Sequence, residues 1–91
     1  MEKTCRVRLV NVKGLHARPC HAIVSAALEY KSDLRISSGA GEVNGRSILE
    51  LMTLSAPCDT ELTIRVIGDD AELLLEKLVD LIARGFDEEL R

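Results

Sequence analysis

The residues best suited to chemistry lie in one short stretch, Gly14-Leu15-His16-Ala17-Arg18-Pro19. Apolar residues at helical spacing follow from position 22 to position 30, so we expect a helix to begin just before them. Pro19 fits a first helical turn, because the amide hydrogens there have no intrahelical partner. His16 would then lie at or next to the N-cap, where free amides and the helix dipole favour a bound anion. Arg18 adds a permanently charged, planar donor that suits phosphate oxygens.

This arrangement suits a phosphoryl group carried on the imidazole of His16. A neutral imidazole is a nucleophile near neutral pH, and both the helix N-terminus and Arg18 should disfavour the protonated ring. No partner base is needed, since the ring nitrogen has its own lone pair. The phosphate oxygens would face Arg18 and the backbone amides of Ala17 and Arg18. A second interpretation stays open at this point, in which His16 only caps the helix and Arg18 is an ordinary solvated residue.

The elements that must position this stretch follow from hydrophobic periodicity. Strict alternation predicts strands over 4–10, 34–37, 42–44 and 62–66, and helical spacing predicts helices that begin near Pro19, Ile48 and Asp69. The order strand, helix, strand, strand, helix, strand, helix predicts an α+β fold with three helices on the apolar face of one four-stranded, mostly antiparallel sheet. Polar side chains should cover the open face of this sheet: Arg6, Arg8, Arg35, Thr63 and Arg65.

Turn and cap signals place the ends of these elements. Residues 38–41 are rich in glycine and predict a hairpin connection, because no phosphate-loop lysine follows them. Asp69, with Glu72 three residues later, is the expected N-cap of the last helix, and Gly85 is its expected C-cap.

Ser47 to Leu54 is the second informative stretch. Ser47 and Glu50 have the Ser-x-x-Glu form of a capping box, so a short helix should start at Ile48. Its apolar residues fall into two arcs, and a helix on a sheet can bury only one of them. One arc, either Leu51 with Leu54 or Ile48 with Leu49 and Met52, should therefore face water, as interaction surfaces on small domains do.

Composition excludes several classes of function. Ninety-one residues with 46% hydrophobic and 30% charged residues predict one globular domain over residues 1–91. The formal net charge of −3 and the aromatic content of 2% argue against nucleic acid as a partner. No apolar run is long enough to span a bilayer and no signal peptide is recognisable, so we expect a cytoplasmic protein without membrane insertion.

The motif Gly-Leu-His-Ala-Arg-Pro resembles the active-site motif of HPr, the histidine-containing phosphocarrier family of the bacterial phosphoenolpyruvate:sugar phosphotransferase system. Asn-Gly-Arg-Ser-Ile-Leu at 44–49 and Leu-Met-Thr-Leu at 51–54 extend the likeness over nearly the whole chain. The segment Arg-Gly-Phe-Asp-Glu at 84–88 is also similar to the nitrogen-branch paralogue, NPr. The active-site motif is common to both branches, so the choice between sugar uptake and nitrogen branch stays open.

The resemblance implies an HPr-like open-faced β-sandwich of order β-α-β-β-α-β-α. It also implies a phosphocarrier, not a self-contained enzyme, that accepts a phosphoryl group from Enzyme I on Nδ1 of His16. The group would pass to a histidine of an EIIA-type protein, with Arg18 and the Ala17 amide stabilising the phosphate. No metal or other cofactor is implied, and the carrier would act as a monomer.

The resemblance further assigns partner binding to the exposed patch on the second helix. Ile48, Leu49 and Met52 match the surface on which partners dock, and Cys20, where the family usually has alanine, is grouped with these partner-binding residues. Ser47 matches a serine that an HPr kinase/phosphorylase phosphorylates in many relatives, although capping alone explains a serine there. Glu50, where the family more often has glycine, departs from the pattern within this surface.

Two other functions stay open. A regulatory module of the same fold would signal through docking at the second helix, with His16 or Ser47 as its phosphorylation switch. A metal- or redox-responsive protein would use His16 and Cys20, which lie four residues apart, although two ligands do not complete a zinc site.

Overall fold

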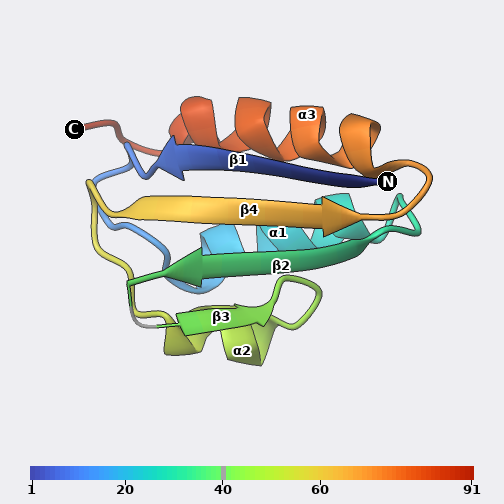
Figure 1. The fold of residues 1–91 in the computed structure, drawn as a ribbon. Helices are drawn as coiled ribbons and strands as arrows, with labels where there is room; N and C mark the ends of the chain where they lie inside the picture. Colours follow the sequence, from blue (N-terminus) through green and yellow to red (C-terminus); the bar gives the residue numbers. More distant parts are fainter. Residues whose placement is uncertain (40) are drawn as a thin grey trace.

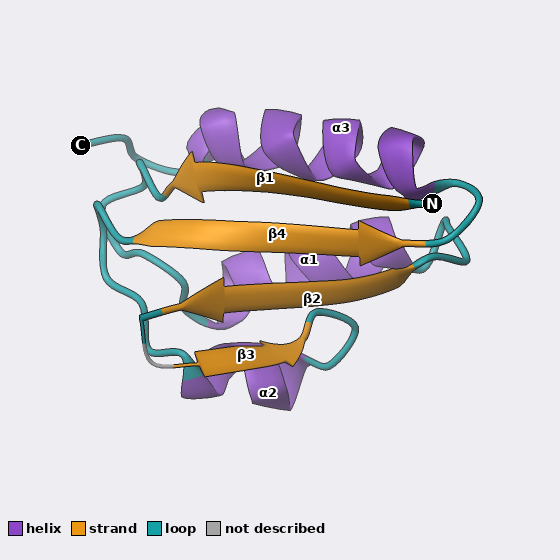
Figure 2. Ribbon diagram, viewed as in Figure 1, coloured by secondary structure: helices purple, strands orange, loops and turns teal. Residues whose placement is uncertain are grey.

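A four-stranded antiparallel sheet forms one layer of the protein (Figures 1 and 2). The computed structural model describes residues 1–39 and 41–91. In these residues the sheet order is β1-β4-β2-β3, and the strands are β1 (Glu2–Arg8), β2 (Asp33–Ser38), β3 (Gly41–Asn44) and β4 (Glu61–Ile67). Since β1 and β2 both pair with β4, the segment between them must cross the sheet, and it does so as a helix.

Three helices lie on one face of the sheet (Figure 2). They are α1 (Ala17–Ala27), α2 (Ile48–Thr53) and α3 (Ala71–Ala83), and a 3₁₀ turn at Gly85–Asp87 follows α3. Helix α1 contacts both α2 and α3, and α3 packs over β1. The predicted α+β class, element order and open-faced architecture are therefore confirmed.

The core between the layers consists of apolar side chains that alternate along the strands and form stripes along the helices. Ile64 of β4 lies opposite Cys5 of β1 on one side and Ile36 of β2 on the other, so their side chains share the buried face. From α1 and α3 the side chains of Ile23, Leu74 and Leu78 are fully buried against this face. Strand β1 begins at Glu2 and not at Thr4, because its backbone pairs with β4 even where the side chains are exposed.

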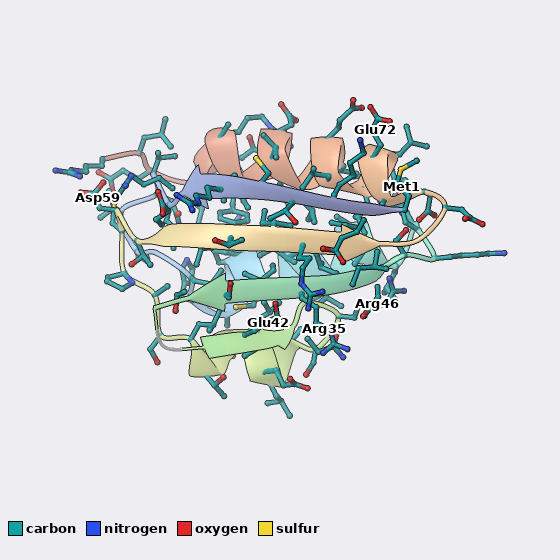
Figure 3. All side chains as sticks on the ribbon, in the orientation of Figure 1. Met1, Arg35, Glu42, Arg46, Asp59 and Glu72 are labelled. Carbon is teal, nitrogen blue, oxygen red and sulfur yellow. The ribbon has the colours of Figure 1, made fainter. Side chains whose placement is uncertain are left out.

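The open face of the sheet carries charged side chains of both signs (Figure 3). The Arg65 guanidinium lies 2.9 Å from a carboxylate oxygen of Glu42, and Arg35 lies 3.2 Å from Asp33. Arg35 and Arg65 therefore have acidic partners and are not free to bind an anion. Such exposed pairs contribute little to stability because water and salt screen them.

Arg46 holds the chain between α1 and β2, a role that the sequence patterns did not indicate. Arg46 donates through Nη1 to the carbonyls of Ala27, Tyr30 and Ser32, at 2.9 to 3.2 Å. A cation is favourable at this position, because the carbonyls at a helix C-terminus carry partial negative charge.

The predicted cap of α3 at Asp69 is wrong, because Asp70 occupies the N-cap. The Asp70 side chain makes no capping bond and instead accepts hydrogen bonds from the amides of Lys31 and Ser32, at 2.8 and 3.0 Å, and from the Ser32 hydroxyl. Sequence could not show this use of the carboxylate, because its partners lie 38 and 39 positions away. The Ser32 hydroxyl and then the Lys31 amide hold the pKa of Asp70 below its ordinary value.

We predict that Asp70→Asn destabilises the fold at neutral pH, because an amide cannot accept all three hydrogen bonds. The pKa of Asp70 is lowered on folding, so its stabilisation is present above the unfolded value of about 4 and is lost as pH falls through the lower folded value. Urea unfolding at pH 7 and at pH 3 should therefore show a difference from the parent that shrinks in acid. Asp69→Asn, at an exposed position, is the control. A difference that stays constant with pH would contradict this linkage.

Candidate functional site

The loop from Asn11 to Leu15 delivers the chain to His16. Gly14 adopts a φ of +66°, and its amide bonds the Asn11 carbonyl at 3.1 Å. The Leu15 amide donates to the carbonyl of Ala56 at 2.8 Å, and the Leu15 side chain is buried. The start of α1 is therefore anchored to the loop that precedes β4, at the left edge of Figure 1.

His16 is the N-cap of α1, as predicted. Its backbone is extended, its carbonyl accepts from the Cys20 amide at 3.1 Å, and its side chain makes no capping bond. Pro19 in the first turn has no amide hydrogen to satisfy. Among the described residues, the amides of Ala17 and Arg18 have no hydrogen-bond partner. These two donors and the dipole of an 11-residue helix make the space beside His16 favourable for an anion.

The imidazole of His16 is bound on one side by a carboxylate that the sequence patterns did not select. Nε2 lies 2.9 and 3.0 Å from the two carboxylate oxygens of Glu88, whereas Nδ1 has no hydrogen-bond partner in the described part of the chain. The His16 side chain is 33% exposed and that of Glu88 is 9% exposed. Asn11 Nδ2 also donates to Glu88, at 3.1 Å, and to the Gly14 carbonyl, at 2.7 Å.

His16 and Glu88 line a shallow hollow of about 330 Å³ at the N-terminal end of α1. Arg18 lines it with its Nε 4.0 Å from a Glu88 oxygen, and its side chain is 79% exposed. Lys13 and Glu89 line it as well. Partial burial alone would raise the pKa of the Glu88 carboxyl, but hydrogen bonds from His16 and Asn11 hold it below its ordinary value. The hollow thus pairs an exposed cation, Arg18, with the ionised carboxylate of Glu88.

Glu88 reaches His16 because the chain reverses after α3. Gly85, Phe86 and Asp87 have φ values of 64°, 57° and 60°, all in the left-handed region. The C-cap of α3 is Arg84 and not the predicted Gly85, which follows it in the left-handed conformation that ends the helix. Phe86, one of the two non-glycine residues that continue the reversal, has a buried ring. Residues 85–91 carry no periodic pattern, so Gly85 was the one usable signal. A glycine there predicts where the helix ends but not in which direction the chain continues.

Known proteins resemble this chain over nearly its whole length. A family model described as "PTS HPr component phosphorylation site" matches residues 3–84. The phosphocarrier protein HPr of Treponema pallidum is 36% identical over 83 residues, which cover 91% of this chain and 94% of the relative. That of Borreliella burgdorferi is 35% identical and covers 90% and 93%. The crystal structure of HPr-C-His from Thermoanaerobacter tengcongensis superposes with a TM-score of 0.91 at 34% identity, covering 97% of this chain and 99% of that one.

The chain belongs to the HPr family. It is therefore a phosphocarrier protein of the phosphotransferase system, and the predicted family is confirmed. Within the described residues, no helix is long and apolar enough to cross a membrane. Nor do any three His, Cys, Asp or Glu side chains gather there in a way that could hold a metal ion.

The second helix of this HPr-family protein exposes the apolar arc expected from its sequence. Leu49 is 80% and Met52 is 43% exposed, and Ile48 is half-buried against the core. We call these three residues the α2 patch. On the opposite arc, Leu51 and Leu54 are buried. Helix α2 packs against α1, so the α2 patch and His16 lie on contacting elements.

The capping box before the α2 patch is only half formed. Ser47 Oγ accepts from the Glu50 amide at 3.2 Å, as predicted. The Glu50 carboxylate, however, accepts from the Asn44 amide at 3.1 Å and not from the Ser47 amide. The reason is that the Ser47 amide already donates to the Asn44 carbonyl.

The assignment of Cys20 to the partner-binding surface is wrong. Its side chain is 0% exposed and packs in the core of this HPr fold, where a partner cannot touch it. Burial raises the pKa of the Cys20 thiol to about 11, which leaves little reactive thiolate at neutral pH. The redox or metal role for His16 with Cys20 therefore loses its second residue.

We predict that Gly14→Ala destabilises the protein and displaces His16. A Cβ at this position would lie 2.5 Å from the Ala56 carbonyl oxygen and 2.8 Å from the Pro57 backbone, and left-handed strain adds roughly 1–3 kcal/mol. Urea unfolding and the NMR shifts of the His16 ring would measure both effects. Gly39→Ala is the matched control, because its Cβ would meet nothing within 4 Å. Equal stability of the two variants would contradict the role given to Gly14.

Proposed function

We propose that His16 accepts a phosphoryl group on Nδ1 from phosphoenolpyruvate-charged Enzyme I and passes it to a histidine of an EIIA-type protein. The chain would act in the cytoplasm as a monomer, as a carrier between two protein partners. Arg18 and the amides of Ala17 and Arg18 would neutralise the phosphate during each transfer.

The observation that carries this proposal is the position of one imidazole at a helix N-terminus. Nδ1 of His16 has no hydrogen-bond partner among the described residues, and the Ala17 and Arg18 amides beside the ring are free donors. A nucleophile with donors at the place where negative charge accumulates is what phosphoryl transfer needs. Arg18 is mostly exposed, so it could follow a phosphate without enclosing it. Such weak retention suits a carrier that must also release the group.

We predict that the parent protein gains one phosphoryl group on incubation with phosphoenolpyruvate and Enzyme I, and that His16→Ala gains none. Intact mass after treatment with mild acid or mild base would measure this, since phosphohistidine is lost in acid and kept in base. His21→Ala is the matched control, because His21 is exposed on α1 and should leave the phosphorylation unchanged. Full phosphorylation of His16→Ala would overturn the site, and a parent that gains no mass while folded would overturn the carrier function.

The α2 patch is the proposed docking surface for Enzyme I and the EIIA-type acceptor. Exposed apolar side chains on a helix that contacts α1 can supply binding energy without taking part in the chemistry. We predict that Met52→Glu raises the KM of Enzyme I for this protein roughly tenfold, because a buried charge at such a contact costs more than 1 kcal/mol, and that kcat changes less. Leu73→Glu, at an exposed apolar position on α3, is the control. If Met52→Glu and Leu73→Glu had the same KM, the α2 patch would not be the docking surface.

A second candidate function is a regulatory module that binds partners through the α2 patch and is switched by phosphorylation. Ser47, which caps α2, is the proposed target of an HPr kinase/phosphorylase. A phosphate there would adjoin both the α2 patch and the like charge of Glu50, so it would alter docking. Onward transfer at a useful rate would favour the carrier, and phosphorylation without onward transfer would favour the regulatory module.

A further inference from the structure

The Glu88 carboxylate lies on the side of the His16 ring opposite the proposed acceptor nitrogen. Both of its oxygens are within 3.0 Å of Nε2. The tail around it is held on the backbone, with Val12 N–H donating to the Glu89 carbonyl and Arg91 N–H to the Val10 carbonyl, each at 2.9 Å. Glu88 itself is also bonded by Asn11. The contact with His16 is therefore part of the folded chain and not a passing contact of a loose terminus.

This contact decides which ring nitrogen carries the proton. An ionised carboxylate has acceptors and no donor, so Nε2 of His16 must donate to Glu88. In a neutral ring the lone pair then belongs to Nδ1, which is the nitrogen without a partner in the described residues. The opposite tautomer would place two lone pairs against each other at 2.9 Å.

We propose that Glu88 is a positioning residue that keeps a proton on Nε2 of His16 throughout the transfer cycle. This inference rests on the proposed function. As the Nδ1 lone pair bonds to phosphorus, the bond from phosphorus to the donor breaks and its electron pair stays with the donor. The ring becomes an imidazolium whose charge Glu88 offsets, and no proton leaves. On transfer to the acceptor the Nδ1–phosphorus bond breaks, and the ring departs as a neutral imidazole with its Nε2 proton still in place.

The charged groups that face the ring act in opposite directions. Arg18 and Lys13 oppose a positive ring, whereas Glu88 and Glu89 favour it. Of these four, only Glu88 is within hydrogen-bond distance of the imidazole. Its effect should therefore be the largest, because a charge in direct contact is screened least.

The proton on Nε2 controls how easily the phosphoryl group leaves. A phosphorylated imidazole that has lost this proton would depart as an anion, which is a much poorer leaving group. A carboxylate in contact with an imidazole typically raises the pH at which the ring loses its proton by about one unit or more. On the falling side of a pH profile, one unit corresponds to a tenfold difference in rate. Glu88 would therefore let the carrier release its phosphoryl group at neutral and mildly alkaline pH.

The test compares the full-length parent with Glu88→Gln, Glu88→Asp and Glu89→Gln. Each is phosphorylated with phosphoenolpyruvate and Enzyme I, and the rate of loss of the phosphoryl group to water is followed from pH 5 to pH 10. We expect the pH at which this rate has fallen by half to be about one unit lower for Glu88→Gln than for the parent. Glu88→Asp should restore part of the shift, and Glu89→Gln, which removes a charge from the same hollow, should change it little. Identical profiles for the parent and Glu88→Gln would overturn the inference.

A second measurement needs no phosphorylation and therefore separates this inference from the proposed function. The ¹⁵N shifts of the His16 ring in the unmodified parent at pH 8 report the tautomer directly. We expect a proton on Nε2 in the parent and a mixture of tautomers in Glu88→Gln. A proton mainly on Nδ1 in the parent would overturn the inference even if Glu88→Gln failed to fold. A parent that shows the expected tautomer but takes up no phosphoryl group would contradict the carrier function alone.

Discussion

The hydrogen bond from the Leu15 amide to the Ala56 carbonyl joins two loops, and the candidate site depends on it. This 2.8 Å contact, together with burial of the Leu15 side chain, brings the start of α1 against the chain that leads from α2 into β4. Gly14 allows the close approach because any side chain there would meet the backbone of Ala56 and Pro57. The backbone of His16 is therefore positioned by main-chain contacts, and among the described residues its ring is held by Glu88 at Nε2 alone.

The two nitrogens of the His16 ring lie in different surroundings. Nδ1 has no hydrogen-bond partner among the described residues, whereas Nε2 is held by Glu88. The helix N-terminus attracts a phosphate, whereas the Glu88 carboxylate repels it. The two therefore limit how strongly the site holds the group, which a carrier must also release. A site that bound phosphate as strongly as possible would accept the group and keep it, because strong binding of the intermediate raises the barrier to the next transfer. Arg18, mostly exposed, adds a charge that can move aside.

The proposed docking surface is separate from the residues proposed for the chemistry. Helix α2 has six residues and is too short to be stable alone, so Leu51 and Leu54 anchor it in the core while the α2 patch faces outward. Its contact with α1 sets the distance between the proposed docking surface and His16. Because both belong to one rigid core, a protein seated on the α2 patch would find the imidazole in a constant place.

The sequence by itself determined the element order, the buried faces, the N-cap position of His16 and the exposed arc of α2. These features depend on local spacing, which fixes the direction of side chains along a helix or strand. It failed at Asp69, half of the capping box and Cys20, and it missed Glu88, Asn11 and Arg46. In each of these cases the outcome depends on a partner or on packing that comes from another part of the chain. Glu88 lies 72 positions from His16, and only the left-handed turn after α3 and the pairing of the tail with residues 10–12 bring them together. Periodicity carries no information on contacts at that separation, so tertiary structure alone decided which nitrogen of His16 remains free.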